Sequence, residues 1–329
     1  MIGAGRMGQT HAEVLRTVDG VNIVAVVDFI VENARKLADM FAAKVMTLEE
    51  VLADKSIQAV IITTPTASHA DLIIAAAKAG KAIFTEKPAT HNLEAAEQVL
   101  KVLKETKAKC QVGFMRRYDP AYLEVKKRLD NNELGALENF RGISRDPLAP
   151  NIDYLRTCGG IMVDFGIHDF DSARFFFGEA SEVYAIATAI RNKELADEGL
   201  YDLALATVKF ANGAIGNFEM ALNTSYGYEI VADILGEKGK FHLEKKQELN
   251  YESWTEKGIC HDYPPDFGHR FPEAYANEII AFANNVLADK ELSPTVEDAS
   301  RSLVLAMAAQ QSLETGKVVK ISEIMPDFL

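Results

Sequence analysis

A glycine-rich turn at the start of the chain restricts the fold more than any other feature of the sequence. Gly3-Ala4-Gly5-Arg6-Met7-Gly8 fits the pattern G-x-G-x-x-G, and a helical pattern follows it at once. In a strand–turn–helix unit the first glycine allows a tight bend, the second lets a pyrophosphate approach the backbone, and the third lets the helix pack closely on the sheet. The turn therefore predicts a dinucleotide-binding unit whose phosphates face the amino end of a helix.

Short apolar runs and helical patterns alternate from this turn to about residue 115. The apolar runs, rich in Val, Ile and Phe, are predicted as buried strands at residues 21–27, 59–63, 81–85 and 109–114. The helical patterns cover residues 9–18, 31–41, 69–79 and 93–106. Such alternation implies right-handed crossovers and a parallel sheet covered by helices on both faces. The predicted fold class is α/β, a doubly wound Rossmann domain over residues 1–117.

A different pattern begins at residue 118, with several strands and little helix between them. The predicted strands are residues 138–144, 182–189, 203–210, 214–220, 228–235 and 240–243. Asn212-Gly213 separates two of these runs and predicts a hairpin, because both residues tolerate positive φ. The last helix is expected to run from a capping box at Thr295 to Gly316. Residues 118–329 are therefore predicted as an α+β domain whose last helix packs back on the first domain.

Composition excludes several classes of protein. The 329 residues carry a formal net charge of -13, which on average repels nucleic acids and anionic membranes. Three widely spaced cysteines, Cys110, Cys158 and Cys260, argue against a disulfide framework and a structural zinc site. No segment reaches the ~18 apolar residues of a membrane-spanning helix, and no signal-peptide pattern precedes the turn. We therefore expect a soluble protein of the reducing cytoplasm, without a metal and without nucleic-acid or membrane partners.

Only Met1 and Ile2 precede the glycine-rich turn, although the strand before such a turn lies in the middle of a doubly wound sheet. Losing that strand should be costly. We therefore expect that the first strand is truncated in this sequence, that Met1 is an internal methionine, and that the native amino terminus lies upstream. The upstream codons or the intact mass of the natural protein would test this expectation.

Asp28 ends the second predicted strand, twenty positions after Gly8. A carboxylate at this place accepts hydrogen bonds from the hydroxyls of the adenosine ribose and repels a 2′-phosphate. Phe29 follows it with no arginine beside it, so NAD is favoured over NADP. The alternative is that Gly3–Gly8 forms a plain turn and that Asp28 is a helix cap.

Two further strand ends carry candidate residues, since ligands bind at the carboxyl edge of a parallel sheet. Thr64-Pro65-Thr66 fits either a cofactor contact or a proline turn that caps the helix at His69, where a packing role is favoured over catalysis. Glu86-Lys87-Pro88 follows the next strand. There a lysine can hold a substrate hydroxyl or polarise a carbonyl, and Pro88 restricts Lys87 to extended conformations. The alternative for Lys87 is a solvated lysine in a turn.

A second chemically distinctive segment, Gly159–Asp171, has the sequence GGIMVDFGIHDFD. If it is helical, Asp164 and His168 lie one turn apart on the same face. A carboxylate beside an imidazole orients the ring and stabilises its protonated form, which a general base needs when it takes a proton from an alcohol. The alternatives are a buried pair that satisfies itself and a metal site, although two ligands without a third support a metal only weakly.

In this order, the motifs resemble the Gfo/Idh/MocA oxidoreductase family, whose signature is a glycine-rich turn, a Glu-Lys-Pro strand end and a Gly-Gly…Asp-x-x-x-His helix. The resemblance runs from Gly3 to about Ile321. It is strongest toward the inositol dehydrogenases of that family, through the segments 113–120, 144–147, 167–175 and 226–228. The resemblance implies NAD-dependent oxidation of a secondary alcohol on a cyclic polyol. Myo-inositol, oxidised to 2-keto-myo-inositol (scyllo-inosose), is the leading substrate that it implies.

The same resemblance implies roles for single residues. His168 takes the hydroxyl proton, Asp164 tunes His168, and Lys87 anchors the reacting oxygen. These three catalytic residues also belong to the expected substrate contacts, together with Met115, Arg116 and either Tyr226 or Tyr228. The residues expected to bind the cofactor are Gly3, Gly5, Arg6, Met7, Gly8, Asp28, Thr64, Pro65, Glu86 and Lys87.

The family also implies a cis peptide bond at Lys87-Pro88. It implies an open-faced sheet in the second domain that forms dimer or tetramer contacts, and it implies a role in inositol catabolism. Two regions depart from the inositol subgroup. After Tyr226-Gly227-Tyr228 that subgroup tends to have Asp-Gln-Arg, whereas this chain has Glu229-Ile230-Val231. Residues 146–157 have fewer prolines than expected, so the preferred stereoisomer stays open.

Three other functions compete with this one. The first is a dehydrogenase for another ring, such as scyllo-inositol, an aldose or an anhydrosugar, and the sequence discriminates poorly against it. The second is an NAD-binding regulator that has lost the chemistry, which the presence of Lys87, Asp164 and His168 opposes. The third is an NADP-dependent reductase, which Asp28 opposes.

Overall fold

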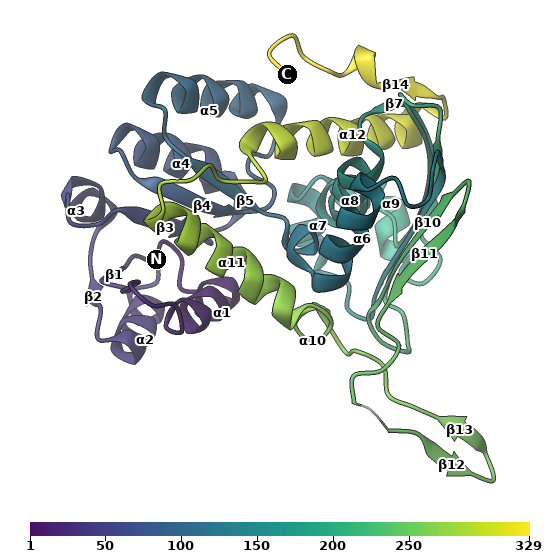
Figure 1. The fold of residues 1–329 in the computed structure, drawn as a ribbon, viewed down its shortest axis with the longest axis horizontal. Helices are drawn as coiled ribbons and strands as arrows, with labels where there is room; N and C mark the ends of the chain where they lie inside the picture. Colours follow the sequence, from purple (N-terminus) through teal and green to yellow (C-terminus); the bar gives the residue numbers. More distant parts are fainter. Residues whose placement is uncertain (250) are drawn as a thin grey trace. The chain divides into compact units, whose positions relative to one another are not determined.

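The computed structural model describes the whole chain except Asn250 and the side chain of Thr157. The chain divides into two compact units (Figure 1). Unit 1 consists of Met1–Met115, Ala274–Arg301 and Asp327–Leu329, and unit 2 consists of Arg116–Glu273 and Ser302–Pro326.

Parallel strands form the sheet of unit 1, as the alternating pattern predicts. They are β1 (Ala25–Val26), which pairs with β2 (Lys44–Val45), and β3 (Ala59–Ile62), β4 (Ala82–Glu86) and β5 (Cys110–Gly113), which pair in that order. Ile2 makes parallel bridges to Val27 and Ile62, so the residue before Gly3 lies in the strand position between β1 and β3. The predicted Rossmann fold is confirmed, and the glycine-rich turn, Asp28 and Thr64 all follow strands at the carboxyl edge of the sheet.

The helices of unit 1 differ in how they begin, since a side-chain cap is present at some of their amino ends and absent at others. They are α1 (Arg6–Leu15), α2 (Val31–Phe41), α3 (Leu48–Ala53), α4 (His69–Lys78) after the short 3-10 turn η1 (Thr66–Ser68), α5 (Leu93–Thr106) and α11 (Pro272–Leu287). Asn92 caps α5 by accepting a hydrogen bond from the backbone N–H of Ala95 at 2.8 Å. Thr47 and Glu50 form a capping box at the start of α3. The predicted bounds of α2 and α5 are confirmed.

Helix α11 joins unit 1 through long-range packing. Ile279 and Phe282 of α11 belong to a buried apolar cluster that includes Ile61 of β3, Phe84 of β4 and Leu15 of α1. Burying a large apolar side chain contributes roughly 1.5–3 kcal/mol, so this cluster fixes the helix firmly. The sequence pattern assigns all residues after 117 to the second domain, whereas Ala274–Arg301 belong to unit 1. Contacts between residues distant in sequence decide where this segment packs.

Unit 2 contains a seven-stranded sheet. In spatial order its strands are β11 (Gly239–Glu244), β10 (Glu229–Gly236), β6 (Leu137–Asp146), β9 (Ile215–Leu222), β8 (Leu203–Phe210), β7 (Ala180–Thr188) and β14 (Val319–Lys320). Only the pairing of β6 with β9 is parallel, so the predicted mostly antiparallel sheet is confirmed. At the predicted hairpin, Gly213 has φ +92°, and the N–H of Phe210 donates to the carbonyl of Ala214 at 2.8 Å.

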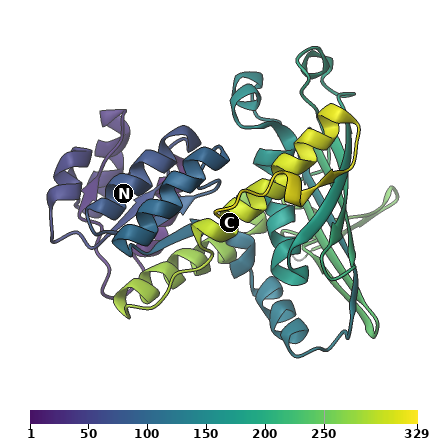
Figure 2. The ribbon, with the colours of Figure 1, turned by 90° about the horizontal axis from the view of Figure 1, so that it is seen from above.

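Unit 2 also contains helices (Figure 2). They are α6 (Pro120–Asp130), α7 (Ile152–Thr157), α8 (Ile167–Phe177), α9 (Lys193–Asp197), α10 (Phe267–Arg270) and the part of α12 (Val296–Thr315) that follows Arg301. Of these helices, α8 packs against β6 and α6 against β11 on the sheet. Short 3-10 turns η2 (Met115–Tyr118) and η4 (Ile321–Glu323), the π-helical turn η3 (Ile161–Phe165) and a hairpin of β12 (Ser253–Thr255) and β13 (Gly258–Cys260) complete the described elements. Phe170 of α8 packs edge-on against Phe218 of β9, with ring centroids 5.0 Å apart.

The expected start and end of the last helix are confirmed. Thr295 and Asp298 exchange hydrogen bonds before α12, and Gly316, with φ +66°, follows its last residue. Within the described part of the chain, none of the helices combines the length and the apolar character needed to span a bilayer.

Candidate active site

The three glycines of the amino-terminal turn have different surroundings in unit 1. Gly3 has φ +101°, a conformation that favours glycine, and a side chain there would lie 2.8 Å from Thr63. A Cβ at Gly8 would lie 2.3 Å from the carbonyl oxygen of Gly3, so only glycine fits between turn and helix. A Cβ at Gly5 would meet nothing within 4 Å. The turn therefore leaves open space at Gly5, directly before the amino end of α1, where a pyrophosphate would approach the backbone.

Asp28 is held in place by two backbone amides. Its carboxylate accepts a hydrogen bond from the N–H of Ala4 at 2.7 Å and another from the N–H of Ile30 at 2.8 Å. The amino-terminal cap of α2 is Ile30, and Asp28 does not cap that helix. The side chain thus ties the glycine-rich turn to the end of β1, and its contact with ribose stays a prediction. Arg6 and Met7 lie in the first turn of α1.

His69 connects the two other strand ends of unit 1. Its ring nitrogens lie 2.8 Å from the carbonyl oxygens of Thr64 and Pro88, and the side chain is 1% exposed. The expectation that His69 packs rather than catalyses agrees with this buried position. The peptide bond Lys87-Pro88 is cis, as the family resemblance implies. Lys87 is half-buried directly after β4, so a simple solvated turn does not describe it.

Asp164 and His168 lie on successive helical turns of unit 2, but the helix is not uniform. Asp164 belongs to η3, where the N–H of Gly166 donates to the carbonyl of Ile161 at 2.9 Å, five residues back. His168 lies in the first turn of α8. The α-helical spacing assumed for this pair is therefore interrupted by a π-helical turn, which is frequent at functional sites. Both side chains are half-buried.

Tyr154 is a site residue that the sequence did not indicate. Its hydroxyl donates a hydrogen bond to the carboxylate of Asp164 at 3.0 Å. Burial raises the pKa of Tyr154, and the neighbouring charge of Asp164 raises it further, so the phenol stays a proton donor. No local pattern could have revealed the contact, because ten residues and a change of helix separate the two side chains.

Buried ion pairs fix the helix that carries His168. Arg116 donates a hydrogen bond to Asp169 at 2.6 Å and another to Ser144 of β6 at 3.1 Å. Arg116 and Asp169 are each 2% exposed. Burial opposes the charge of Arg116, but Asp169 together with Tyr122 and Tyr228 outweighs burial and raises the pKa of the guanidinium. In this structure Arg116 anchors α8, and its predicted contact with the substrate stays a prediction, as does that of buried Met115.

The two candidate tyrosines differ in exposure. Tyr226 is 48% exposed and donates a hydrogen bond to Glu229 at 2.5 Å, while Arg145 donates to its hydroxyl at 3.0 Å. Tyr228 is 4% exposed. Glu229, which departs from the subgroup pattern, thus has a defined role in holding Tyr226. Exposure favours Tyr226 over Tyr228 as the residue that a ligand can reach.

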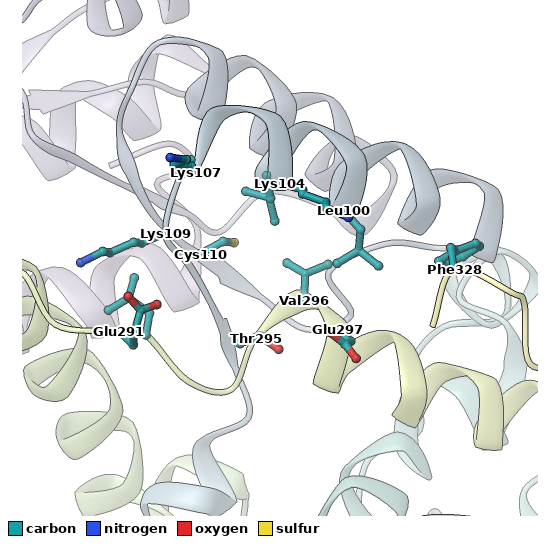
Figure 3. A pocket seen from close by; sticks show the side chains of 13 residues that line it. Leu100, Lys104, Lys107, Lys109, Cys110, Glu291, Thr295, Val296, Glu297 and Phe328 are labelled. Atoms are coloured by element: carbon teal, nitrogen blue, oxygen red, sulfur yellow. The ribbon is translucent and has the colours of Figure 1, made fainter.

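Two hollows of unit 1 are lined by none of the residues predicted to bind the cofactor. One has a volume of about 580 Å³ and is lined by side chains of α5, Cys110 and the segment that leads into α12, including Lys104, Glu291 and Val296 (Figure 3). The other, of about 630 Å³, is lined mostly by apolar residues such as Val24 and Phe282. Neither adds a residue to the candidate site.

A metal site is one of the alternatives for Asp164 and His168. Among the described residues, the acidic, histidine and cysteine side chains that come close enough to hold one ion are His11, Glu86 and Glu278. This set contains neither Asp164 nor His168. Glu86 of this set lies 2.6 Å from the ring of His11, and its contact with the cofactor stays a prediction.

Comparison with known proteins covers nearly the whole chain. A family model for the Gfo/Idh/MocA oxidoreductases, NAD-binding Rossmann fold, matches residues 1–114, and the model for the C-terminal alpha/beta domain of the same family matches residues 126–321. An inositol 2-dehydrogenase of Rhizobium meliloti (strain 1021) is 37% identical over 327 residues, which cover 98% of each chain.

Two further proteins extend the comparison. A scyllo-inositol 2-dehydrogenase (NAD(+)) of Bacillus subtilis (strain 168) is 38% identical, covering 98% of this chain and 95% of the relative. The crystal structure of a scyllo-inositol dehydrogenase from Lactobacillus casei with bound NAD(H) and scyllo-inositol superposes with a TM-score of 0.91 at 26% identity, covering 98% of each chain. With both family models matched and relatives similar over their full length, the chain belongs to the Gfo/Idh/MocA family of NAD-dependent oxidoreductases.

Proposed function

We propose that this protein oxidises one ring hydroxyl of an inositol to a ketone with NAD as hydride acceptor, and that myo-inositol, giving 2-keto-myo-inositol, is its leading substrate. The observation that carries the proposal is full-length similarity to proteins named as inositol dehydrogenases, in a chain that has Lys87, Asp164 and His168. The open space at Gly5 and the fixed carboxylate of Asp28 fit NAD.

The chain's own residues supply binding and proton transfer. NAD, when bound, accepts the hydride of the carbinol carbon. His168 takes the hydroxyl proton as general base, and Asp164 orients the ring and stabilises its protonated form. Tyr154 holds the carboxylate of Asp164. Lys87 binds the reacting oxygen and favours its loss of the proton, since a positive charge lowers the free energy of a developing alkoxide.

The test is NADH absorbance at saturating NAD with myo-inositol, scyllo-inositol, chiro-inositol, glucose and xylose. We expect clear turnover with an inositol and the highest kcat/KM with myo-inositol. A higher kcat/KM for scyllo-inositol or a sugar would replace the substrate while keeping the reaction class. Silence across the panel with intact NAD binding would favour the non-catalytic regulator and would overturn the proposal.

A homo-oligomer, a dimer or tetramer, is part of the proposal. Strands β7, β8 and β9 expose large apolar side chains on the face of the unit 2 sheet opposite to α8, namely Tyr184, Ile186, Leu205 and Ile215. Ile186 and Leu205 lie opposite one another on neighbouring strands, whereas Ile215 lies opposite Lys209. Exposed apolar side chains that cluster in this way on a sheet face favour a protein interface. We also propose a role in inositol catabolism in the reducing cytoplasm, which agrees with three described cysteines that form no disulfide. Light scattering of the purified protein tests the oligomer.

A further inference from the structure

A buried cluster of three ionisable side chains lies behind the Glu-Lys-Pro segment in unit 1. His11 comes from α1, Glu86 from the end of β4 and Glu278 from α11 (Figure 1). One nitrogen of His11 and one oxygen of each carboxyl group lie within 4.8 Å of one another. His11 and Glu278 are 0% exposed. The proposed reaction gives no task to His11 or Glu278.

Counting donors and acceptors shows that this cluster is incomplete. Nε2 of His11 lies 2.6 Å from Oε1 of Glu86, and since an ionised carboxylate only accepts, the ring nitrogen donates. Within the described part of the chain, Nδ1 of His11 and both carboxyl oxygens of Glu278 have no hydrogen-bond partner. A buried polar group without a partner costs roughly 1–3 kcal/mol, and a charged one costs more. Something must therefore neutralise Glu278.

A bound divalent cation would neutralise the two carboxylates, but the geometry opposes it. Ligands that bind zinc at ~2.0–2.2 Å in a tetrahedron lie roughly 3.3 Å apart. The His11–Glu86 separation of 2.6 Å is instead that of a charge-assisted hydrogen bond.

We propose that Glu278 keeps a proton in the folded enzyme and that its neutral carboxyl group, turned toward the hydrogen-bonded His11–Glu86 pair, completes a cluster that positions the Glu86-Lys87 strand end. The cluster connects three elements of unit 1. Helix α1 follows the glycine-rich turn, β4 leads into Lys87, and α11 carries Glu278. The rings of Phe84 and Tyr275 flank His11 at 5.1 and 6.3 Å between centroids. Its effect on catalysis rests on the proposed function of Lys87, whereas the protonation of Glu278 does not.

The surroundings of Glu278 favour its neutral form. Burial raises the pKa of Glu278 well above its ordinary value, and the charge of Glu86 raises it further. The ionisable groups that face it are Glu86 of β4 and His11 of α1. Gln111 of β5, which is neutral, donates to its backbone carbonyl at 3.1 Å. Among the described residues, these neighbours include no lysine or arginine to favour the charged form.

The raised pKa has a defined consequence for stability. Above the ordinary glutamate pKa of ~4.3 the unfolded chain releases this proton while the folded protein keeps it. The folded state then binds more protons, so stability falls as pH rises, until the pH exceeds the folded pKa of Glu278. Glu278→Gln, which is permanently neutral and of equal size, should remove that fall.

The first experiment measures Tm between about pH 5 and pH 8 for the full chain with NAD absent. We expect Tm of Glu278→Gln to gain on wild type as pH rises, whereas Glu273→Gln, a matched change at an exposed position of the same helix, keeps the wild-type slope. If Glu278→Gln loses stability relative to wild type as pH rises, Glu278 is ionised and the proposal is wrong. Infrared difference spectra at neutral pH give a second reading: the carbonyl stretch of a protonated carboxyl must be present in wild type.

The second experiment separates the proton from a metal and tests the positioning role. Metal analysis of the purified protein should find no stoichiometric divalent ion, and about one ion per chain that Glu278→Gln abolishes would overturn the proposal. Glu278→Gln should keep kcat within about twofold, while His11→Ala should lower kcat about tenfold with KM for NAD nearly unchanged. If His11→Ala kept the wild-type kcat, the positioning role would be wrong, but the protonation of Glu278 would stand. If no substrate of the panel were oxidised, the proposed function would fail, but the Tm and infrared tests of Glu278 would still hold.

Discussion

In unit 1, the residues expected to bind NAD are held by the backbone, whereas in unit 2 the residues expected to transfer the proton are held by buried charged side chains. Gly3, Gly5 and Gly8 set the turn, and the amides of Ala4 and Ile30 hold Asp28. Around His168, by contrast, the fixing contacts are ion pairs such as Arg116–Asp169 and Arg117–Asp171.

This difference has consequences for mutation. A backbone-built site tolerates the loss of a side chain unless the side chain itself touches the ligand, because the amides stay where they are. A site supported by buried ion pairs loses its support when one partner changes, since the remaining charge is buried without compensation. Substitutions in unit 1 should therefore alter binding or catalysis, while those around α8 should first alter stability.

The largest effect is expected at Lys87. Lys87→Met keeps the length of the side chain and removes its charge, so kcat should fall about 10³-fold, in the range typical of a group that stabilises charge or moves a proton. Tm and the Kd for NAD should stay close to wild type. Stopped-flow or steady-state NADH assays measure kcat, and Lys101→Met on the exposed side of α5 is the control. Turnover like wild type would remove Lys87 from the mechanism.

The next effect concerns the buried pair in unit 2. Asp169→Asn conserves shape but leaves the guanidinium of Arg116, 2% exposed, without its counter-charge. We expect the free energy of unfolding to fall by about 3 kcal/mol. The matched control is Asp130→Asn, which breaks the exposed i,i+4 pair with Lys126 and should cost less than about 0.5 kcal/mol. Urea denaturation compares the two, and equal losses would contradict the contrast between buried and exposed pairs.

The sequence was informative where function depends on the backbone. Gly3–Gly8 predict the turn, because only glycine permits the required conformation and close packing. Asp28 predicts the end of the second strand. Glu86-Lys87-Pro88 could also be recognised from the sequence, because a polar segment with a proline directly follows an apolar strand. The alternation of apolar runs also predicted the Rossmann sheet, and Asn212-Gly213 predicted a turn that the structure contains.

The sequence was silent where function depends on contacts across the fold. Nothing near Tyr154 indicates that it reaches Asp164, and nothing near Glu278 indicates that it meets His11 and Glu86. Helix α11 was not predicted for a related reason, since its apolar face is defined by partners more than two hundred residues earlier, such as Leu15 and Ile61. The π-helical turn that contains Asp164 begins directly after Gly159 and Gly160, both at positive φ, and the sequence pattern did not indicate it.

A smaller effect is expected when the charge of Asp28 is removed. Asp28→Asn keeps an oxygen that accepts from the backbone amide of Ala4 or Ile30, so the turn should fold. It loses the repulsion of a 2′-phosphate, and the ratio of kcat/KM for NADP to that for NAD should rise about tenfold, which corresponds to ~1.4 kcal/mol. Asp39→Asn, exposed on α2, should leave the ratio unchanged. An unaltered ratio in Asp28→Asn would count against the ribose contact.

The smallest expected effect on kcat concerns the hydrogen bond from Tyr154 to Asp164 in unit 2. Tyr154→Phe removes one hydroxyl that donates to Asp164 at 3.0 Å and leaves the ring in place. A single hydrogen bond to a charged acceptor contributes about 1.5 kcal/mol, and partial exposure of Tyr154 reduces this, so kcat should fall roughly fivefold with KM for NAD unchanged. Tyr251→Phe, an exposed tyrosine, is the matched control. If Tyr154→Phe instead raised KM for the polyol without changing kcat, the tyrosine would bind substrate and Asp164 would be oriented by other groups.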